Sequence, residues 1–268
     1  MLYKKADPYK LKSSKRNKEP AMINDQQKKV KQNLQVKFSQ YLKKYKESVH
    51  LPEYKFIHDI CLGILKTNSV ICNKIAISLN EKVSVKKVCE RFTRHLNKVS
   101  LGETIHRGII EMQCRDIGLD TAIIIDDSDI VKSKAKQMEG LKRVRDGSRG
   151  THHQLGYDLL NIIAVDNTEE GYDIKPVSSD LLSMKIEEDN MIQITEDRMV
   201  EIALASGNKG VYVLDRGYDR RSVFNILKTH ELNYIIRSTA KRDLIVENEE
   251  QSFLKVAKSI KLKYSYKA

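Results

Sequence analysis

TAIIIDDS, at residues 121–128, is an apolar segment that runs directly into two acids. Its length and its three isoleucines predict a buried β-strand. A second segment of this kind, VYVLD at residues 211–215, ends in Asp215. A carboxylate at the carboxyl end of a buried strand lies at the rim of a sheet, beside an open crevice. Two such carboxylates on adjacent strands can hold divalent metal ions for phosphoryl transfer.

Asp127 and Asp215 are therefore the predicted catalytic residues and metal ligands, with Mg²⁺ expected and Mn²⁺ possible, because both ions prefer hard oxygen donors. Asp126 complicates the choice. Successive strand residues point to opposite faces, so Asp126 and Asp127 are not expected to bind the same ion, and alternation alone does not choose between them. For Asp215 the alternative is a turn or cap role, since Gly217 and Asp219 follow it. Its occurrence at a matching strand end favours the metal role.

Further strands and helices surround these two segments. Apolar runs and helical spacing predict strands at 155–166 and 172–178, a helix at 189–205, a helix at 220–229 and a strand at 233–237. The resulting order is three strands, helix, strand, helix, strand. It is the element order of an RNase H-like core, in which helices flank a mixed sheet. The expected fold class is therefore α/β.

The positive charge is concentrated in the first part of the chain. Residues 1–100 contain 23 Lys and Arg against 8 Asp and Glu, a net charge of +15. The remaining residues are nearly balanced, with a net charge of −3. Such asymmetry indicates a module that binds a polyanion, joined to a second part of the chain with a different function. Nucleic acid is favoured over an anionic membrane surface, because the chain shows no aromatic-rich amphipathic helix.

The basic region is predicted to be helical. Residues 1–22 are expected to form a flexible basic arm, residues 23–115 an all-α domain, and residues 116–268 the RNase H-like core. Short helices with a basic last one are compatible with a helix-turn-helix-like DNA-binding module. The alternative is a helical domain with a solvated lysine face. The expected DNA contacts on that last helix are Lys86, Lys87, Arg91, Arg94 and Lys98.

A second basic stretch follows Asp127 and could contact DNA phosphates, although a solvated loop would have the same composition. Its candidate residues are Lys142, Arg143, Arg145 and Arg149. The four cysteines show no C-x-x-C spacing, and the first residues lack the apolar core of a signal peptide. The apolar runs are too short to cross a bilayer. These features predict a reduced, cytoplasmic protein without a membrane partner.

The two acidic segments, together with Met138-Glu139-Gly140-Leu141 and Arg145-Asp146-Gly147-Ser148, resemble bacterial insertion-sequence DDE transposases of the IS-four-like group. The resemblance covers about residues 55–237 and includes the segment 214–219, Leu-Asp-Arg-Gly-Tyr-Asp. In that family the first acid precedes a small hydroxyl residue, which corresponds to Asp127. The second belongs to an Asp-Arg motif at a strand end, which corresponds to Asp215. The resemblance implies metal-dependent cleavage of transposon ends, followed by strand transfer into target DNA and assembly as a homodimer on paired ends.

The sequence departs from the family at the third metal ligand, a Glu in a Tyr-x-x-Arg-x-x-x-Glu setting. Tyr-x-x-Arg occurs at Tyr218 and at Tyr234, but the Glu position is filled by Asn225 and Lys241. The core is therefore expected to be incomplete and this chain to be inactive or impaired. The alternatives are a non-catalytic DNA-binding transposase fragment and a plain metal-dependent nuclease of the same fold.

Overall fold

The computed structural model describes residues 25–146, 151–183, 191–240 and 242–261. The chain divides into two compact units, Met1–Glu90 and Arg91–Ala268. The predicted arm at 1–22 lies outside the described residues. The expected boundary at residue 115, between a DNA-binding and a catalytic part, stays a prediction about function.

The first unit is helical. It contains α1 (Asp25–Lys43), α2 (Leu51–Thr67), α3 (Cys72–Leu79) and the beginning of α4 (Val85–Leu96). Pro52 lies in the first turn of α2, where its missing N–H costs no hydrogen bond. Gly63 lets α2 and α3 approach closely, since a Cβ at this position would lie 2.2 Å from Cγ2 of Ile75.

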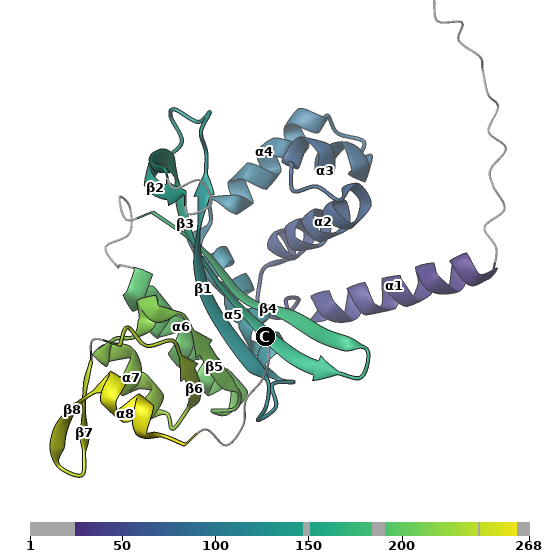
Figure 1. Ribbon diagram of the computed structural model, residues 1–268. Coiled ribbons are helices and arrows are strands. Elements are labelled where there is room, and N and C mark those ends of the chain that lie inside the picture. Colours follow the sequence, from purple (N-terminus) through teal and green to yellow (C-terminus); the bar gives the residue numbers. More distant parts are fainter. Residues whose placement is uncertain (1–24, 147–150, 184–190, 241, 262–268) are drawn as a thin grey trace, which may run out of the picture. The chain divides into compact units, whose positions relative to one another are not determined.

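The second unit is built on a mixed sheet of six strands (Figure 1). Four strands follow one another without an intervening helix in the described residues: β1 (Ala122–Val131), β2 (Lys142–Asp146), β3 (Thr151–Thr168) and β4 (Gly171–Leu182). β3 pairs antiparallel with β1, β2 and β4. β5 (Val211–Leu214) runs parallel to β1, and β6 (Asn233–Ile236) runs parallel to β5. Across the sheet, the order β4–β3–β1–β5–β6 with these directions is that of an RNase H-like sheet, as predicted.

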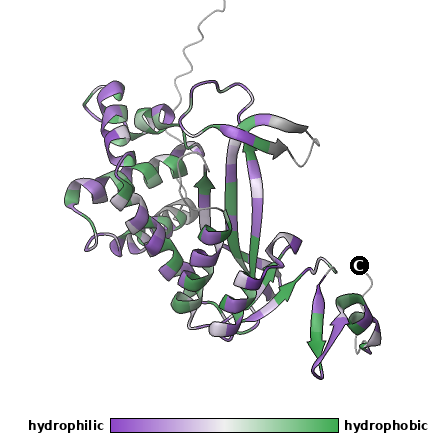
Figure 2. Cartoon of the chain, turned by 90° about the vertical axis from the view of Figure 1, so that its left-hand side faces the viewer, coloured by the Kyte–Doolittle hydropathy of each residue, from purple (hydrophilic) through white to green (hydrophobic). Residues whose placement is uncertain are grey.

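Helices bury one face of this sheet. They are α5 (Val99–Cys114), α6 (Met191–Ser206) and α7 (Arg221–Thr229). The core beneath them contains Ile123 and Ile125 of β1, Leu160 and Ile162 of β3, and Tyr212 of β5, all at most 1% exposed. Figure 2 shows how hydrophobic residues recur along the strands. Period-two alternation thus sends alternate residues in the apolar parts of β1, β3 and β5 into this core.

The remaining elements of the unit are short. A 3₁₀ turn, η1 (Arg216–Tyr218), follows β5, and a hairpin of β7 (Asp243–Val246) and β8 (Glu249–Ser252) leads into α8 (Phe253–Ser259). No single helix in the described ranges is long and apolar enough to cross a membrane. α2 and α3 pass such a test only as a pair, and that pair is bent by 94°.

Candidate metal and nucleic-acid site

The parallel pairing of β1 with β5 brings two acids to one place. The register pairs Ile124 with Val213 and Ile125 with Leu214. One step further along both strands are Asp126 and Asp215. Ile125 and Leu214 are buried under the helices, so the next residue on each strand belongs to the opposite face. Asp126 and Asp215 therefore share both a face and an edge of the sheet, and both are exposed.

Asp127 has a different environment. The hydroxyl of Tyr218 donates to Oδ1 of Asp127 over 3.2 Å, and Tyr218 itself is buried. This hydrogen bond ties β1 to the turn that follows β5. Asp127 as a metal ligand stays a prediction, whereas the register makes Asp126 the acid beside Asp215. The sequence could not provide this register.

The electrostatics suit a divalent cation. Although Asp126 is exposed, part of its carboxylate is desolvated, and its pKa is raised first by this partial burial and then by the negative charges of Asp127 and Asp215. A bound cation would remove this repulsion, and carboxylate oxygens are the donors that Mg²⁺ and Mn²⁺ prefer. Within the described ranges, no group of three or more His, Cys, Asp or Glu side chains is placed to hold a metal ion. Among the described residues, the carboxylates placed to bind a metal ion at this site are therefore the pair Asp126 and Asp215.

The acid pair lies on the face of the sheet opposite the helix-covered core. We call this the open face, because its side chains are half-buried or exposed, with Ile174 60% and Ile235 63% exposed. Outside the row that contains the acids, most residues of this face are apolar, with Ser128 and Asn233 as polar exceptions. Its apolar residues, in register across five strands, are Ala122, Ile124, Leu159, Ile163, Val165, Ile174, Pro176, Leu181, Val211, Val213 and Ile235.

The predicted DNA contacts of the basic helix lie on α4 and just after it. Lys86, Lys87, Arg94 and Lys98 are exposed, as a nucleic-acid contact requires. Arg91 is half-buried, with its guanidinium 5.5 Å from the ring centroid of Phe92. Exposure is compatible with the predicted role but does not distinguish it from a solvated lysine face.

The second basic stretch is mixed in character. Lys142 forms an ion pair with Asp158 of β3 and is largely buried, so its charge is already neutralised. Arg143 is exposed on β2. For Arg145 the structure describes the backbone in β2 but not the side chain, and Arg149 lies outside the described residues. Of this group, Arg143 is the one whose described side chain is available to a phosphate.

Asp219 was not singled out as a functional residue in the sequence, although it follows Asp215 by four residues. Its side chain is only 1% exposed and forms an ion pair with Arg242. Oδ2 of Asp219 also accepts hydrogen bonds from the backbone N–H and hydroxyl of Thr239 (2.8 and 3.0 Å) and from the hydroxyl of Ser238 (3.2 Å). Burial by itself raises the pKa of Asp219, but these hydrogen bonds and the charge of Arg242 lower it overall. Asp219 thereby fastens the segment after β6 to the turn after β5.

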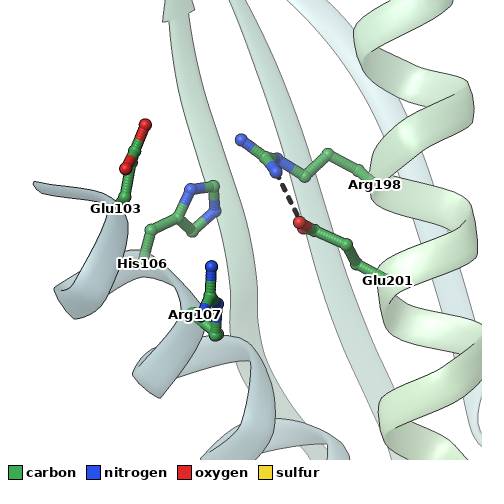
Figure 3. Close-up of a pocket in the computed structure, with 5 residues that line it drawn as sticks. All are labelled: Glu103, His106, Arg107, Arg198 and Glu201. Atoms are coloured by element: carbon green, nitrogen blue, oxygen red, sulfur yellow. Dashed lines mark hydrogen bonds and ion pairs between the residues drawn. The ribbon is translucent and has the colours of Figure 1, made fainter. Parts of the chain in front are cut away.

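A polar cavity of about 290 Å³ lies between α5 and α6 (Figure 3). It is lined by Glu103, His106, Arg107, Arg198 and Glu201. Below it, Arg198 donates to both carboxylate oxygens of Asp180, and His106 lies 2.9 Å from the hydroxyl of Ser178. The pKa of His106 is lowered by burial and by the charge of Arg198, so this imidazole is neutral at pH 7. The network joins both helices to β4, and we assign it a structural role.

No protein-family model matches the chain, and no curated protein matches it. Among solved structures, it is similar to the Mos1 transposase paired-end complex with left transposon end, at 14% identity, a TM-score of 0.28 and coverage of 70% of this chain and 60% of that chain. It is also similar to the Mos1 mariner paired end complex with Mn, at 14% identity, a TM-score of 0.27 and coverage of 68% of this chain and 59% of that chain. The chain thus spans about 60% of the first of these proteins. A likeness this distant assigns neither a function nor a site.

Proposed function

We propose that this chain is the core of a DNA transposase that cleaves transposon ends and transfers them to target DNA with the help of a divalent metal ion. The observation that carries the proposal is the register of β1 and β5, which sets Asp126 beside Asp215 at one edge of an RNase H-like sheet. The sequence motifs that resemble insertion-sequence transposases surround these same two strand ends.

Asp126 and Asp215 are the proposed metal ligands, with Asp127 as the alternative first ligand from sequence. A bound Mg²⁺ or Mn²⁺ would polarise the phosphodiester and lower the pKa of the attacking water. The carboxylates supply the negative charge that holds the cation, and the two parallel strands fix their separation. Tyr218 holds Asp127 on the other face, which keeps the end of the β1–β5 pair rigid. Because the described donors are a pair, the proposal includes weak cleavage by this chain alone.

DNA is the proposed partner, both as transposon ends and as target. The +15 net charge of residues 1–100 supports this, because cationic side chains release counterions from DNA on binding. Exposed Lys86, Lys87, Arg94 and Lys98 are the proposed phosphate contacts of the basic helix. Pairing of two ends by a homodimer, and a bacterial cytoplasm as the location, complete the proposal.

Nicking of supercoiled plasmid tests the catalytic part. We expect weak nicking with Mg²⁺ or Mn²⁺, none with EDTA, and loss of nicking in Asp126→Ala and Asp215→Ala. Asp127→Asn separates the two assignments for the first acid, because it keeps a hydrogen-bond acceptor for Tyr218 while removing the charge. If Asp127→Asn abolishes nicking and Asp126→Asn does not, Asp127 is the ligand. Nicking that persists in the Asp215→Ala variant would refute the proposed centre.

A non-catalytic DNA-binding fragment is the second candidate, favoured by the absence of a three-donor group among the described residues. Such a protein would bind DNA with the same salt dependence. Its binding would be unchanged by substitution of either acid, and it would show no nicking at any metal concentration. A plain nuclease would nick the plasmid but form no joined strand-transfer product.

A further inference from the structure

The acid pair presents an electrostatic problem for the proposed substrate. A DNA phosphate carries a negative charge, and it must approach the strand ends where Asp126 and Asp215 share one face, with the charge of Asp127 next to them on the other face. One divalent cation offsets two of these charges, and the remaining charge repels the phosphate. Cationic side chains at the same edge would neutralise it and orient the strand. The carboxyl ends of β5 and β6 supply such side chains.

Five arginines follow these two strands within the described ranges. Two have partners within the protein: Arg242 is paired with Asp219, and Nε of Arg220 donates to the carbonyl of Gly217 over 2.9 Å. The other three, Arg216, Arg221 and Arg237, are exposed. No side-chain ion pair or hydrogen bond of these three occurs in the described part of the chain. They are therefore available to an external anion.

Arg237 has the most defined position of the three. The register pairs Leu214 with Ile236, so Arg237 is level with Asp215 at the end of the parallel pair. The backbone N–H of Arg237 donates to the carbonyl of Leu214 over 3.3 Å, which holds the backbone of Arg237 against the end of β5. Alternation along β6 puts Arg237 on the same face as Ile235, the open face. One row of the sheet thus contains Asp126, Asp215 and Arg237 in this order.

The backbone just after Arg237 is held in place by contacts with a buried carboxylate. Ser238, Thr239 and Arg242 all bind the buried carboxylate of Asp219, which belongs to the turn after Asp215. The guanidinium of Arg242 also lies 4.7 Å from the ring centroid of Phe224 on α7. A guanidinium presented from a fixed backbone loses less freedom on binding than one on a loose loop.

We propose that Arg237 binds a phosphate of the DNA strand that lies along the Asp126–Asp215 pair, and that Asp219 positions the Arg237 segment for this contact. This inference rests on the proposed function, because it takes DNA to approach this edge. It adds a substrate-binding residue from β6 to a site otherwise built from β1 and β5.

The test is a salt titration of DNA binding by the full chain in EDTA, with a fluorescein-labelled duplex and anisotropy as the readout. Arg237→Ala should weaken binding at low salt about tenfold, since a charge-assisted hydrogen bond is lost. It should also reduce the slope of log K against log salt by about one, the signature of one lost phosphate contact. Arg237→Lys should keep the slope. The matched control is Arg115→Ala, an exposed arginine that precedes the amino end of β1.

Asp219→Asn tests the positioning role, because it keeps the shape of the side chain but removes the charge that holds Arg242. We expect it to weaken DNA binding less than Arg237→Ala does, and to have no additional effect in the Arg237→Ala background. A merely structural role would instead lower affinity equally in both backgrounds. Circular dichroism confirms that each variant is folded.

Equal affinities and equal slopes for Arg237→Ala and Arg115→Ala would overturn the inference. The proposed function fails separately, in the nicking assay with metal. If the unmodified chain nicks plasmid but Arg237→Ala does not change DNA binding, the transposase proposal stands and Arg237 is removed from it. If Arg237→Ala weakens DNA binding but the unmodified chain nicks no plasmid at any metal concentration, the Arg237 contact stands and the transposase proposal falls.

Discussion

Replacing Asp180 with Asn should destabilise the second unit, because Asp180 is the acceptor at the centre of the network beneath α5 and α6. It accepts from Nε of Arg198 at 3.1 and 3.2 Å and from another guanidinium nitrogen at 2.8 Å. The hydroxyl of Ser178 adds a bond of 2.7 Å. The side chains of Asp180 and Arg198 are 11% and 22% exposed, so the variant removes the more buried of the two carboxylates that pair with this guanidinium and leaves only the half-exposed Glu201, at 2.7 Å.

The loss of one partner of a buried ion pair costs about 3–5 kcal/mol, and the remaining exposure of Arg198 places the expected value at roughly 2–3 kcal/mol. For a unit of this size, that corresponds to a fall in Tm of about 5–10 °C. The matched control is Asp173→Asn, which removes an exposed carboxylate 3.3 Å from Lys175. Exposed pairs contribute about 0–1 kcal/mol, so this control should barely move the transition.

The effect should depend on pH in a defined direction. Burial by itself raises the pKa of Asp180, but the hydrogen bonds from Arg198 and Ser178 outweigh it and lower the pKa in the folded state. A depressed folded pKa stabilises the protein fully above the unfolded pKa, which is about 3.9. The stabilisation is lost as pH falls through the folded pKa. The difference between the unmodified protein and Asp180→Asn should therefore be constant above about pH 5 and shrink below about pH 4.

Urea unfolding followed by circular dichroism at several pH values measures this difference. The reasoning is refuted if Asp180→Asn costs no more than Asp173→Asn at pH 7. It is also refuted if the difference grows as the solution is acidified.

Three further results are expected. Tyr218→Phe should lower the free energy of unfolding by about 1 kcal/mol, measured in urea, because it removes the hydrogen bond to Asp127 and leaves that carboxylate partly solvated. Gly156→Ala should cost several times more, since the added Cβ would lie 2.2 Å from the carbonyl oxygen of Ile130, and its urea midpoint should fall accordingly. The open face should bind the dye ANS in the folded protein, and Ile235→Lys should reduce the fluorescence; no fluorescence above that of a control globular protein would contradict the exposure of this face.

Five strands, β1, β3, β4, β5 and β6, and their order along the chain could be predicted from the sequence because their apolar runs are short and strongly β-branched, whereas the hairpin of β7 and β8 was not predicted. The lengths of the five strands could not be predicted. β1 continues through Asp126, Asp127 and Asp129 to Val131, although acids are poor strand residues. Backbone pairing with β3 along this whole stretch supplies the stabilisation that propensity does not. The strand β2 was missed for the same reason, because a basic, glycine-flanked segment reads as a loop.

The candidate site was predictable only in part. Strand ends identified Asp215 and the pair of Asp126 and Asp127, yet the choice within that pair depends on the register with β5, which no local pattern contains. The pairing of Lys142 with Asp158 likewise depends on how β2 meets β3. The sequence marked Arg237 only as part of a Tyr-x-x-Arg motif that lacks its Glu, and its position level with Asp215 depends on the pairing of two parallel strands.

The parallel contact between β1 and β5 joins segments separated by about 90 residues, whereas the hairpin of β3 and β4 joins neighbours. Local contacts form early in folding, and distant parallel ones form late, because a long loop must close first. On the ribosome, Asp126 emerges well before its counterpart and has no carboxylate to cooperate with. A nascent chain that ends before β5 therefore lacks one of the two acids of the proposed metal site.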